Sequence, residues 1–268
     1  MKRIIKKLTN IFSWQREKLA VITAYAEAVQ PWWGSFDLAV DQTKFWHIGN
    51  IMVCVVRFAT QWHIACHNSC APLQFKTFTL ELRDCVQLQP VLADRPIVAS
   101  LENTLHIPAG GRVSLYVSAP AWVRVIAANP VITIDEIACM ELRHTWFGEN
   151  TIDGGFCYTA KIKIATNISD LPSGADRITI PIVIKNDSPN ILDLKKISVP
   201  LQFLSVYCDA GNHLWTEQIT ITQDITNMPA IKISRGIIRM TKGMQLLSKA
   251  RIKPGVGVKQ FLDTLIWK

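Results

Sequence analysis

The strongest constraint on the fold is a two-residue alternation of apolar and polar side chains in the middle of the chain. Isoleucine occupies every second position from Ile178 to Ile184, and residues 218–222 alternate isoleucine with polar side chains. Successive side chains of a β-strand point to opposite faces, so this period indicates strands with one buried face. Turn-forming clusters recur at short intervals, as at residues 109–111 and 153–155. Many short strands separated by turns predict a mainly β body.

Both ends of the chain carry a helical period instead. Residues 3–29 contain neither proline nor glycine, and apolar side chains recur there at three- and four-residue spacing until Pro31. Near the C-terminus the same spacing returns in two stretches separated by Pro254. Proline ends helices, and an apolar stripe beside basic side chains is typical of an amphipathic helix. The sequence therefore predicts a basic amphipathic helix over residues 1–30 and a basic helical segment in two parts over residues 229–268.

A weak internal repeat divides the β-rich middle. Four pairs of similar segments are offset by 82 to 93 residues: Asp94 with Asp176, Asn103 with Asn190, Ser114 with Ser205, and Trp122 with Trp215. This offset is close to the size of one β-sandwich. The expected fold is therefore mainly β, with two tandem β-sandwich-like domains over residues 31–135 and 136–228 and amphipathic helices at both termini. Chance similarity between hydrophobic strands is the alternative explanation of the repeat.

Short tryptophan motifs mark the same region of the chain. They are Trp-Trp-Gly from Trp32, Trp-His-Ile-Gly from Trp46, Gln-Trp-His-Ile-Ala from Gln61, Thr-Trp-Phe-Gly from Thr145, and Leu-Trp-Thr from Leu214. With these motifs, residues 32–222 resemble an uncharacterised prokaryotic domain-of-unknown-function family made of two β-rich halves. Some members of that family are encoded near small-conductance mechanosensitive channels. The resemblance therefore implies association with a membrane and assigns no catalytic residue.

Charge is distributed unevenly along the chain. The net charge of +8 is the balance of +5 in residues 1–18, −5 in residues 19–228 and +8 in residues 229–268. A fold does not require basic ends on an acidic body, so the asymmetry indicates an anionic partner: a membrane surface or a membrane-protein complex. Nucleic acid is less favoured because the basic segments lack interleaved aromatic side chains. The side chains expected to dock are Lys2, Arg3, Lys6, Lys7, Phe12, Trp14, Arg235, Arg239, Lys242, Lys249, Arg251 and Trp267.

Cysteine usage and the apolar segments indicate the compartment. The seven cysteines are odd in number, and Cys54 lies inside an apolar run, as expected of reduced thiols in a cytosol rather than of a disulfide framework. Polar residues between positions 9 and 17 interrupt the apolar stretch that a secretory signal needs. No window offers the roughly 18 apolar residues of a membrane span. The expected localisation is cytoplasmic and peripheral to the inner membrane.

One cluster of potential metal ligands stands out, because His63, Cys66, His67 and Cys70 lie within eight residues. Zinc accepts both imidazole nitrogen and thiolate sulfur. On a strand, however, His63 and His67 would face one side and Cys66 the other. We therefore predict a strand with buried cysteines that runs into a turn, and no cofactor. A metal site is the alternative.

The sequence contains no motif of a nucleophile elbow, a dinucleotide fold or a phosphate-binding loop. Two carboxylate pairs, Asp135 with Glu136 and Glu149 with Asp153, are interpreted as solvated rather than catalytic. The favoured function is a non-enzymatic accessory, scaffold or sensor protein. The alternative is a binder of a small ligand or carbohydrate, or a metal-dependent enzyme, that uses the cluster at residues 63–70 or exposed tryptophans. The candidate tryptophans are Trp32, Trp33, Trp46, Trp62, Trp122, Trp146 and Trp215. We favour the core, however, for the tryptophans that begin or end the expected strands: Trp32, Trp33, Trp46, Trp62 and Trp146.

Overall fold

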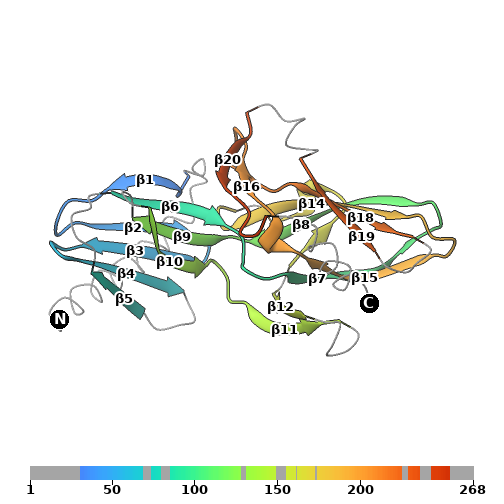
Figure 1. The fold of residues 1–268 in the computed structure, drawn as a ribbon, viewed down its shortest axis with the longest axis horizontal. Coiled ribbons are helices and arrows are strands. Elements are labelled where there is room, and N and C mark those ends of the chain that lie inside the picture. Colours follow the sequence, from blue (N-terminus) through green and yellow to red (C-terminus); the bar gives the residue numbers. More distant parts are fainter. Residues whose placement is uncertain are drawn as a thin grey trace. The chain divides into compact units, whose positions relative to one another are not determined.

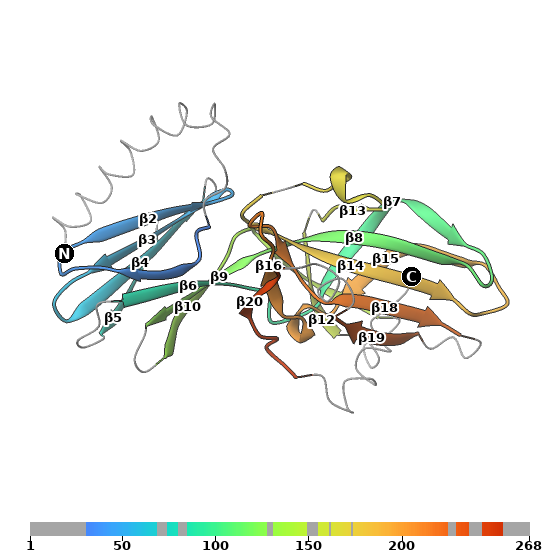
Figure 2. The ribbon, with the colours of Figure 1, turned by 90° about the horizontal axis from the view of Figure 1, so that it is seen from above.

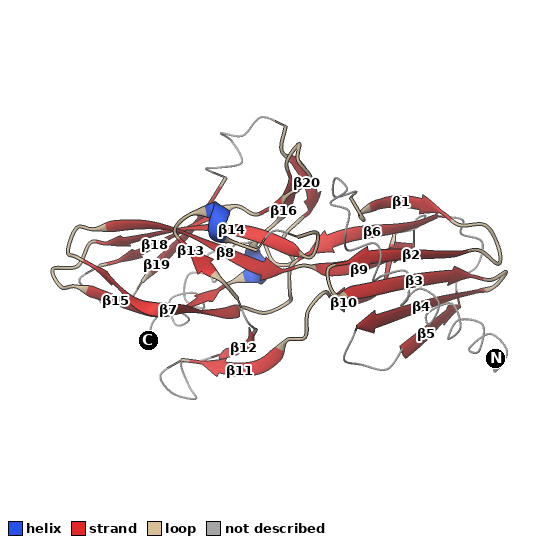
Figure 3. Ribbon diagram, turned by 180° about the vertical axis from the view of Figure 1, so that it is seen from behind, coloured by secondary structure: helices blue, strands red, loops and turns tan. Residues whose placement is uncertain are grey.

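The structure, a computed structural model, is mainly β, as predicted. In the part of the chain that it describes, the helices are two short 3-10 turns, η1 (Ile168–Asp170) and η2 (Leu201–Phe203), among many strands (Figure 3). The chain divides into two compact units, residues 1–31 and 32–268. The expected helix over residues 1–30 lies outside the described residues. The described residues are 31–68, 74–79, 85–127, 131–148, 155–160, 162–172, 174–224, 229–235 and 243–253.

Two four-stranded antiparallel sheets form what we call the first sheet pair (Figure 1). One sheet has the order β1 (Gly34–Asp37), β6 (Cys85–Val91), β9 (Trp122–Ala127) and β10 (Ile132–Ala138). The other has the order β2 (Thr43–Ile48), β3 (Ile51–Arg57), β4 (Gln61–Asn68) and β5 (Gln74–Thr79). Gly49, with a φ of +57°, makes the tight turn between β2 and β3. A Cβ there would lie 2.3 Å from the carboxyl carbon of Asp176. Glycine is therefore required both for the positive φ and for this close approach.

The remaining strands form a second sheet pair. One sheet has the order β11 (Arg143–Phe147), β12 (Gly155–Thr159), β7 (Ile97–Ile107) and β15 (Leu192–Val199). The other has the order β13 (Ile164–Ala165), β8 (Arg112–Pro120), β14 (Arg177–Asn186), β17 (Leu214–Trp215), β16 (Val206–Cys208) and β20 (Gln245–Ser248). β18 (Gln218–Gln223) pairs with the later part of β14 and with β19 (Ala230–Ser234). Figure 2 shows β8, β14 and β18 side by side.

A common hydrophobic core explains the alternation that the sequence displays. The even-numbered isoleucines of β14, from Ile178 to Ile184, are all buried in it. Val53 of β3, Val125 of β9 and Ile197 of β15 belong to the same cluster, so all four sheets contribute to one core. Burial of these apolar side chains is the main stabilising contribution to such a body.

The order of the strands differs from the expected succession of one sandwich over residues 31–135 and another over residues 136–228. β7 and β8 lie in the first of these ranges but pair with β15 and β14 of the second sheet pair, whereas β9 and β10 return to the first. Asp94 and Asp176, the first pair of the sequence repeat, precede β7 and β14, which both belong to the second sheet pair. A repeat reflects strand length and spacing, but pairing depends on partners that are distant in sequence.

The predicted helical segment over residues 229–268 is wrong where the structure describes it. β19 pairs antiparallel with β18, and β20 pairs antiparallel with β16. Available sheet edges therefore override the helical spacing of the local sequence, as tertiary pairing commonly does. The second part of the expected segment, beyond residue 253, lies outside the described residues.

Candidate functional site

The histidine and cysteine cluster lies on β4, with Cys70 outside the described residues. The alternation of β4 places His63 and His67 on one face, whereas Cys66 packs against the core from the other. Burial, and then the negative charge of Asp135, raise the pKa of the Cys66 thiol to about 11, which disfavours a thiolate ligand. Among the described residues, no three of the histidines, cysteines and carboxylates are arranged to hold a metal ion.

The twelve side chains expected to dock fall into three groups: two that are exposed, one that is engaged within the β body, and nine that lie outside the described residues. Arg235 and Lys249 are exposed. Within the described part of the chain, no helix has the length and apolar character needed to cross a membrane. The others, apart from Arg251, lie outside the described residues: Lys2, Arg3, Lys6, Lys7, Phe12, Trp14, Arg239, Lys242 and Trp267.

Arg251 is engaged within the β body, which corrects its assignment to a docking surface. Its Nε donates a hydrogen bond of 2.8 Å to the carbonyl of Leu92, and its Nη2 lies 2.6 Å from Oε2 of Glu136. Glu136 also accepts a 2.6 Å hydrogen bond from Nε of Arg124. Burial raises the pKa of Glu136, but the hydrogen bonds and charges of the two arginines outweigh burial, and the pKa lies below its usual value. Glu136 is thus a structural carboxylate.

Of the five tryptophans expected in the core, Trp32, Trp46 and Trp62 are buried in it, and Trp33 packs against it partly buried. The fifth, Trp146 on β11, is instead 40 % exposed, and it contacts the ring of Phe156 edge-on at 5.2 Å between centroids. Trp215 on β17 is half-buried and lines a pocket. Trp215 is therefore placed to contact a ligand.

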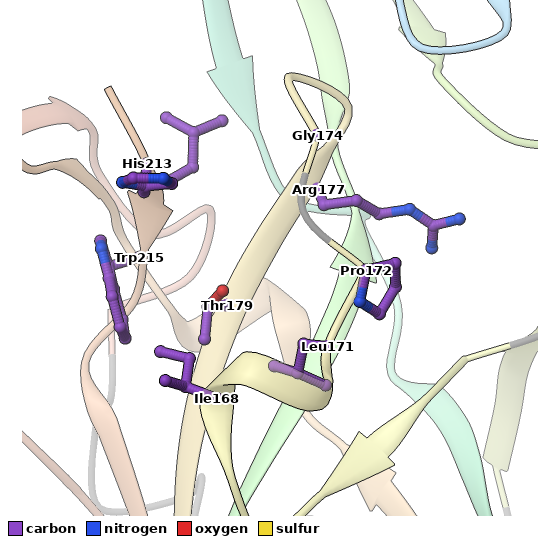
Figure 4. A pocket seen from close by; sticks show the side chains of 9 residues that line it. Ile168, Leu171, Pro172, Gly174, Arg177, Thr179, His213 and Trp215 are labelled. Carbon is purple, nitrogen blue, oxygen red and sulfur yellow. The ribbon is translucent and has the colours of Figure 1, made fainter. Parts of the chain in front are cut away.

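The pocket beside Trp215, which we call the Trp215 pocket, has a volume of about 270 Å³. Figure 4 shows Trp215 and His213 on one side, Leu171 and Pro172 on the other, and Thr179 of β14 between them. The side chain of Arg177 extends away from the two aromatic rings. The residues that line the pocket are Ile168, Leu171, Pro172, Gly174, Arg177, Thr179, His213, Leu214 and Trp215.

Asp209 holds the aromatic side of the pocket in place. Its Oδ2 accepts a 2.9 Å hydrogen bond from the indole Nε1 of Trp215, and its Oδ1 lies 3.3 Å from Nδ1 of His213. The backbone N–H groups of Gly211 and His213 each donate to Oδ1 at 2.9 Å. Burial raises the pKa of Asp209, but these hydrogen bonds and the charge of His213 lower it by more, so the pKa lies below its usual value and the carboxylate stays ionised. The loop therefore orients both aromatic rings before any ligand arrives.

The chemistry that this lining supports is binding. The indole face of Trp215 and the side chains of Ile168 and Leu171 provide apolar walls, and Ile168 is 44 % exposed. The Thr179 hydroxyl and the His213 imidazole provide polar groups at the same pocket. An apolar slot with a few convergent polar groups is the usual composition of a small-molecule site.

Sequence reasoning placed Trp215 among the candidate ligand contacts but missed the residues around it. Ile168 and Thr179 come from separate elements, and nothing in the linear sequence joins them to Trp215. Asp209 carried a signal, because aspartate at the start of a glycine-containing turn commonly accepts hydrogen bonds from the backbone N–H groups that follow. Its position shortly before Trp215 is the signal from which the pocket could have been predicted.

Residues 32–265 match the family described as "Protein of unknown function (DUF432)", so the chain belongs to that family. This confirms the resemblance that the tryptophan motifs indicated. The proximity of some family members to genes of mechanosensitive channels stays a prediction. No curated protein and no solved structure matches the chain.

Proposed function

We propose that this member of the DUF432 family is a non-enzymatic scaffold that binds a small ring-shaped ligand in the Trp215 pocket. The observation that carries the proposal is the fixed orientation of the Trp215 ring, which Asp209 holds through a 2.9 Å hydrogen bond. Asp209 is itself fixed by two backbone N–H donors. A preoriented aromatic ring loses little conformational freedom when a ligand stacks on it, which favours binding.

The size of the pocket defines the class of ligand. Its volume of about 270 Å³ lies just below the range of about 300–1,000 Å³ that is common for ligand pockets. The ligand is therefore a single ring rather than an extended molecule. A monosaccharide, or an aromatic ring with polar substituents, offers both a face for Trp215 and edge groups for Thr179 and His213.

Ligand-detected NMR with the full-length protein tests this proposal, using a panel of monosaccharides and single-ring aromatic compounds. We expect at least one panel member to bind and its affinity to fall about tenfold or more in Trp215→Ala, because the stacking surface is lost. Asp209→Ala should weaken binding by freeing the ring. Trp146→Ala removes an exposed tryptophan outside the pocket and is the matched control. Equal binding by Trp215→Ala and the unaltered protein would refute the proposal.

Docking on an anionic membrane surface or a membrane-protein complex, from the cytoplasmic side of the inner membrane, is a second candidate function. It is supported by the basic segments, +5 over residues 1–18 and +8 over residues 229–268, on either side of an acidic middle. The exposed side chains of Arg235 and Lys249 are available to such a surface. Each lysine or arginine near an anionic leaflet contributes about 1 kcal/mol, so several together support reversible binding.

Co-sedimentation with vesicles of phosphatidylserine and phosphatidylcholine tests docking. We expect binding that weakens with salt, because surface charges are screened over about 8–10 Å at ordinary ionic strength. It should fall when Lys2, Arg3, Lys6 and Lys7 are replaced by glutamine, and it should be insensitive to Trp215→Ala. Failure to sediment, combined with one stoichiometric protein partner in a pull-down from native membranes, would replace the lipid surface by a protein complex.

A further inference from the structure

A separate pocket lies where β6 and β9 meet β20 and the residues that follow it, and its charged lining is entirely basic. We call it the Arg124 pocket, and its volume is about 590 Å³. Arg124 of β9 lines it, together with Lys249 and Arg251 of the segment after β20. In the described part of the chain, no acidic residue is among those that line it. Three cations at one pocket without a carboxylate favour an anionic ligand.

The two arginines of this pocket share a single counter-charge. Nε of Arg124 donates a 2.6 Å hydrogen bond to Oε1 of Glu136, and Nη2 of Arg251 lies 2.6 Å from Oε2 of the same carboxylate. Their side chains are 21 % and 18 % exposed, so solvent screens the repulsion between the two guanidinium groups only in part. Lys249 is exposed and adds a third positive charge. Three cations less one carboxylate leave a net charge of +2, which a bound anion would balance.

The pocket is organised before any ligand binds. Arg124 uses its Nε for Glu136, and its two Nη groups form no hydrogen bond with the described residues, so they remain available as donors. Arg251 is held by a 2.8 Å hydrogen bond from its Nε to the carbonyl of Leu92. Nε2 of Gln89 donates to the carbonyl of Leu247 at 2.6 Å, which ties β20 to β6. Guanidinium groups that are already oriented lose little conformational freedom on binding.

We propose that the Arg124 pocket binds a phosphate monoester group, independently of the Trp215 pocket. Such a group carries a charge of about −1.5 to −2 at pH 7, which matches the net charge of +2. Its oxygens accept hydrogen bonds from the Nη groups of Arg124 and from the Lys249 ammonium group, and a planar guanidinium fits phosphate with two parallel donors. Leu246 is 42 % exposed and lines the same pocket, where it contacts the carbon part of the ester.

Isothermal titration of the full-length protein with glycerol 3-phosphate, in a buffer without phosphate, tests the proposal. Two comparison probes separate charge from geometry: dimethyl phosphate has one negative charge, and succinate has two that lie on separate carboxylates. We expect glycerol 3-phosphate to bind about tenfold more tightly than either probe, because only its phosphate places both charges on one group of oxygens. Equal or tighter binding of succinate would overturn the assignment to a phosphate monoester.

Variants of exposed side chains separate this site from general attraction to a basic protein. Lys249→Gln should weaken binding of glycerol 3-phosphate about fivefold or more and leave the unliganded Tm unchanged, and Lys249→Arg should retain binding. Arg235→Gln is the matched control, since it removes an exposed cation that does not line the pocket. Trp215→Ala should also bind as the unaltered protein does. Equal loss in Lys249→Gln and Arg235→Gln would overturn the site.

The phosphate monoester belongs either to a soluble metabolite or to the headgroup of phosphatidic acid, and co-sedimentation distinguishes these sources. Vesicles of phosphatidic acid and phosphatidylcholine are compared with vesicles of phosphatidylserine and phosphatidylcholine at equal surface charge. Preference for phosphatidic acid that is lost in Lys249→Gln and displaced by glycerol 3-phosphate identifies the headgroup, whereas docking through the basic segments alone predicts no preference. Binding of glycerol 3-phosphate without that preference identifies the soluble ester. Absence of both results would overturn the inference.

Discussion

Replacing Arg251 by alanine should destabilise the β body by about 3 kcal/mol. Arg251 donates a 2.8 Å hydrogen bond to the carbonyl of Leu92, and its Nη2 lies 2.6 Å from Glu136. Its guanidinium carbon is 5.9 Å from the centre of the Trp122 ring. The side chains of Arg251 and Glu136 are 18 % and 22 % exposed, so solvent screens their attraction only in part.

The magnitude follows from these contacts. A hydrogen bond from a charged donor contributes about 1.5–3 kcal/mol, and a partly exposed cation–π contact adds about 0.5–1 kcal/mol. The lost ion pair adds little more, because Arg124 still neutralises Glu136 at 2.6 Å in the variant. In a protein of this length a loss of about 3 kcal/mol corresponds to a fall in Tm of about 6–12 °C.

Thermal unfolding of the full-length protein, followed by circular dichroism, measures this loss. Lys249→Ala is the matched control, since it removes an exposed cation two positions away and should change stability by no more than about 0.5 kcal/mol. If Arg251→Ala and Lys249→Ala unfold at the same temperature, the structural role assigned to Arg251 is wrong. Arg251 would then return to the set of docking side chains.

Three further predictions concern the same body. Asn186 is fully buried, and the two N–H groups of its side chain are shared among three main-chain carbonyls within 3.1 Å of Nδ2. Its Oδ1 accepts two hydrogen bonds from Ser188. Asn186→Ala should therefore lower the free energy of unfolding in urea by about 3 kcal/mol or more, and an unchanged midpoint would contradict this. The folded-state pKa of Glu136 lies below the unfolded value of about 4.3. The ionised side chain therefore stabilises the folded protein fully above that pH, and this contribution is lost as pH falls through the folded pKa. Tm measured from pH 7 to pH 3.5 should decline less steeply in Glu136→Gln than in the unaltered protein. Burial raises the pKa of the Cys54 thiol to about 12, so mass spectrometry after iodoacetamide treatment at pH 8 should find Cys54 unmodified in the folded protein and alkylated in urea.

The parts of the fold that were predictable from sequence are those that depend on one strand at a time. Alternating isoleucines made the strand at residues 177–184 predictable because burial of one face is a local pattern. The partners of β7 and β8 were not predictable in this way, since they are supplied by residues far along the chain. The C-terminal segment shows the same limit: an isolated 229–235 stretch has no edge to pair with, but β18 supplies one in the folded protein.

The candidate site was less predictable than the fold for a related reason. A single aromatic residue such as Trp215 is consistent with either core or surface, and only the surrounding elements decide between them. The segregation of charge was visible at once, since it requires only counting along the chain.

Because β7 and β8 pair with strands from the second half of the chain, neither half contains all the pairing partners of its own strands. A fragment ending in the loop between β10 and β11, at residue 140, contains β7 and β8 without β15 and β14, and so exposes two long unpaired strands. Unpaired strand edges promote association, so this fragment should aggregate when it is made alone. The complementary fragment from residue 141 supplies the missing strands. Produced together, the two pieces should assemble into one body, which makes this loop a suitable division point for a split-protein reporter.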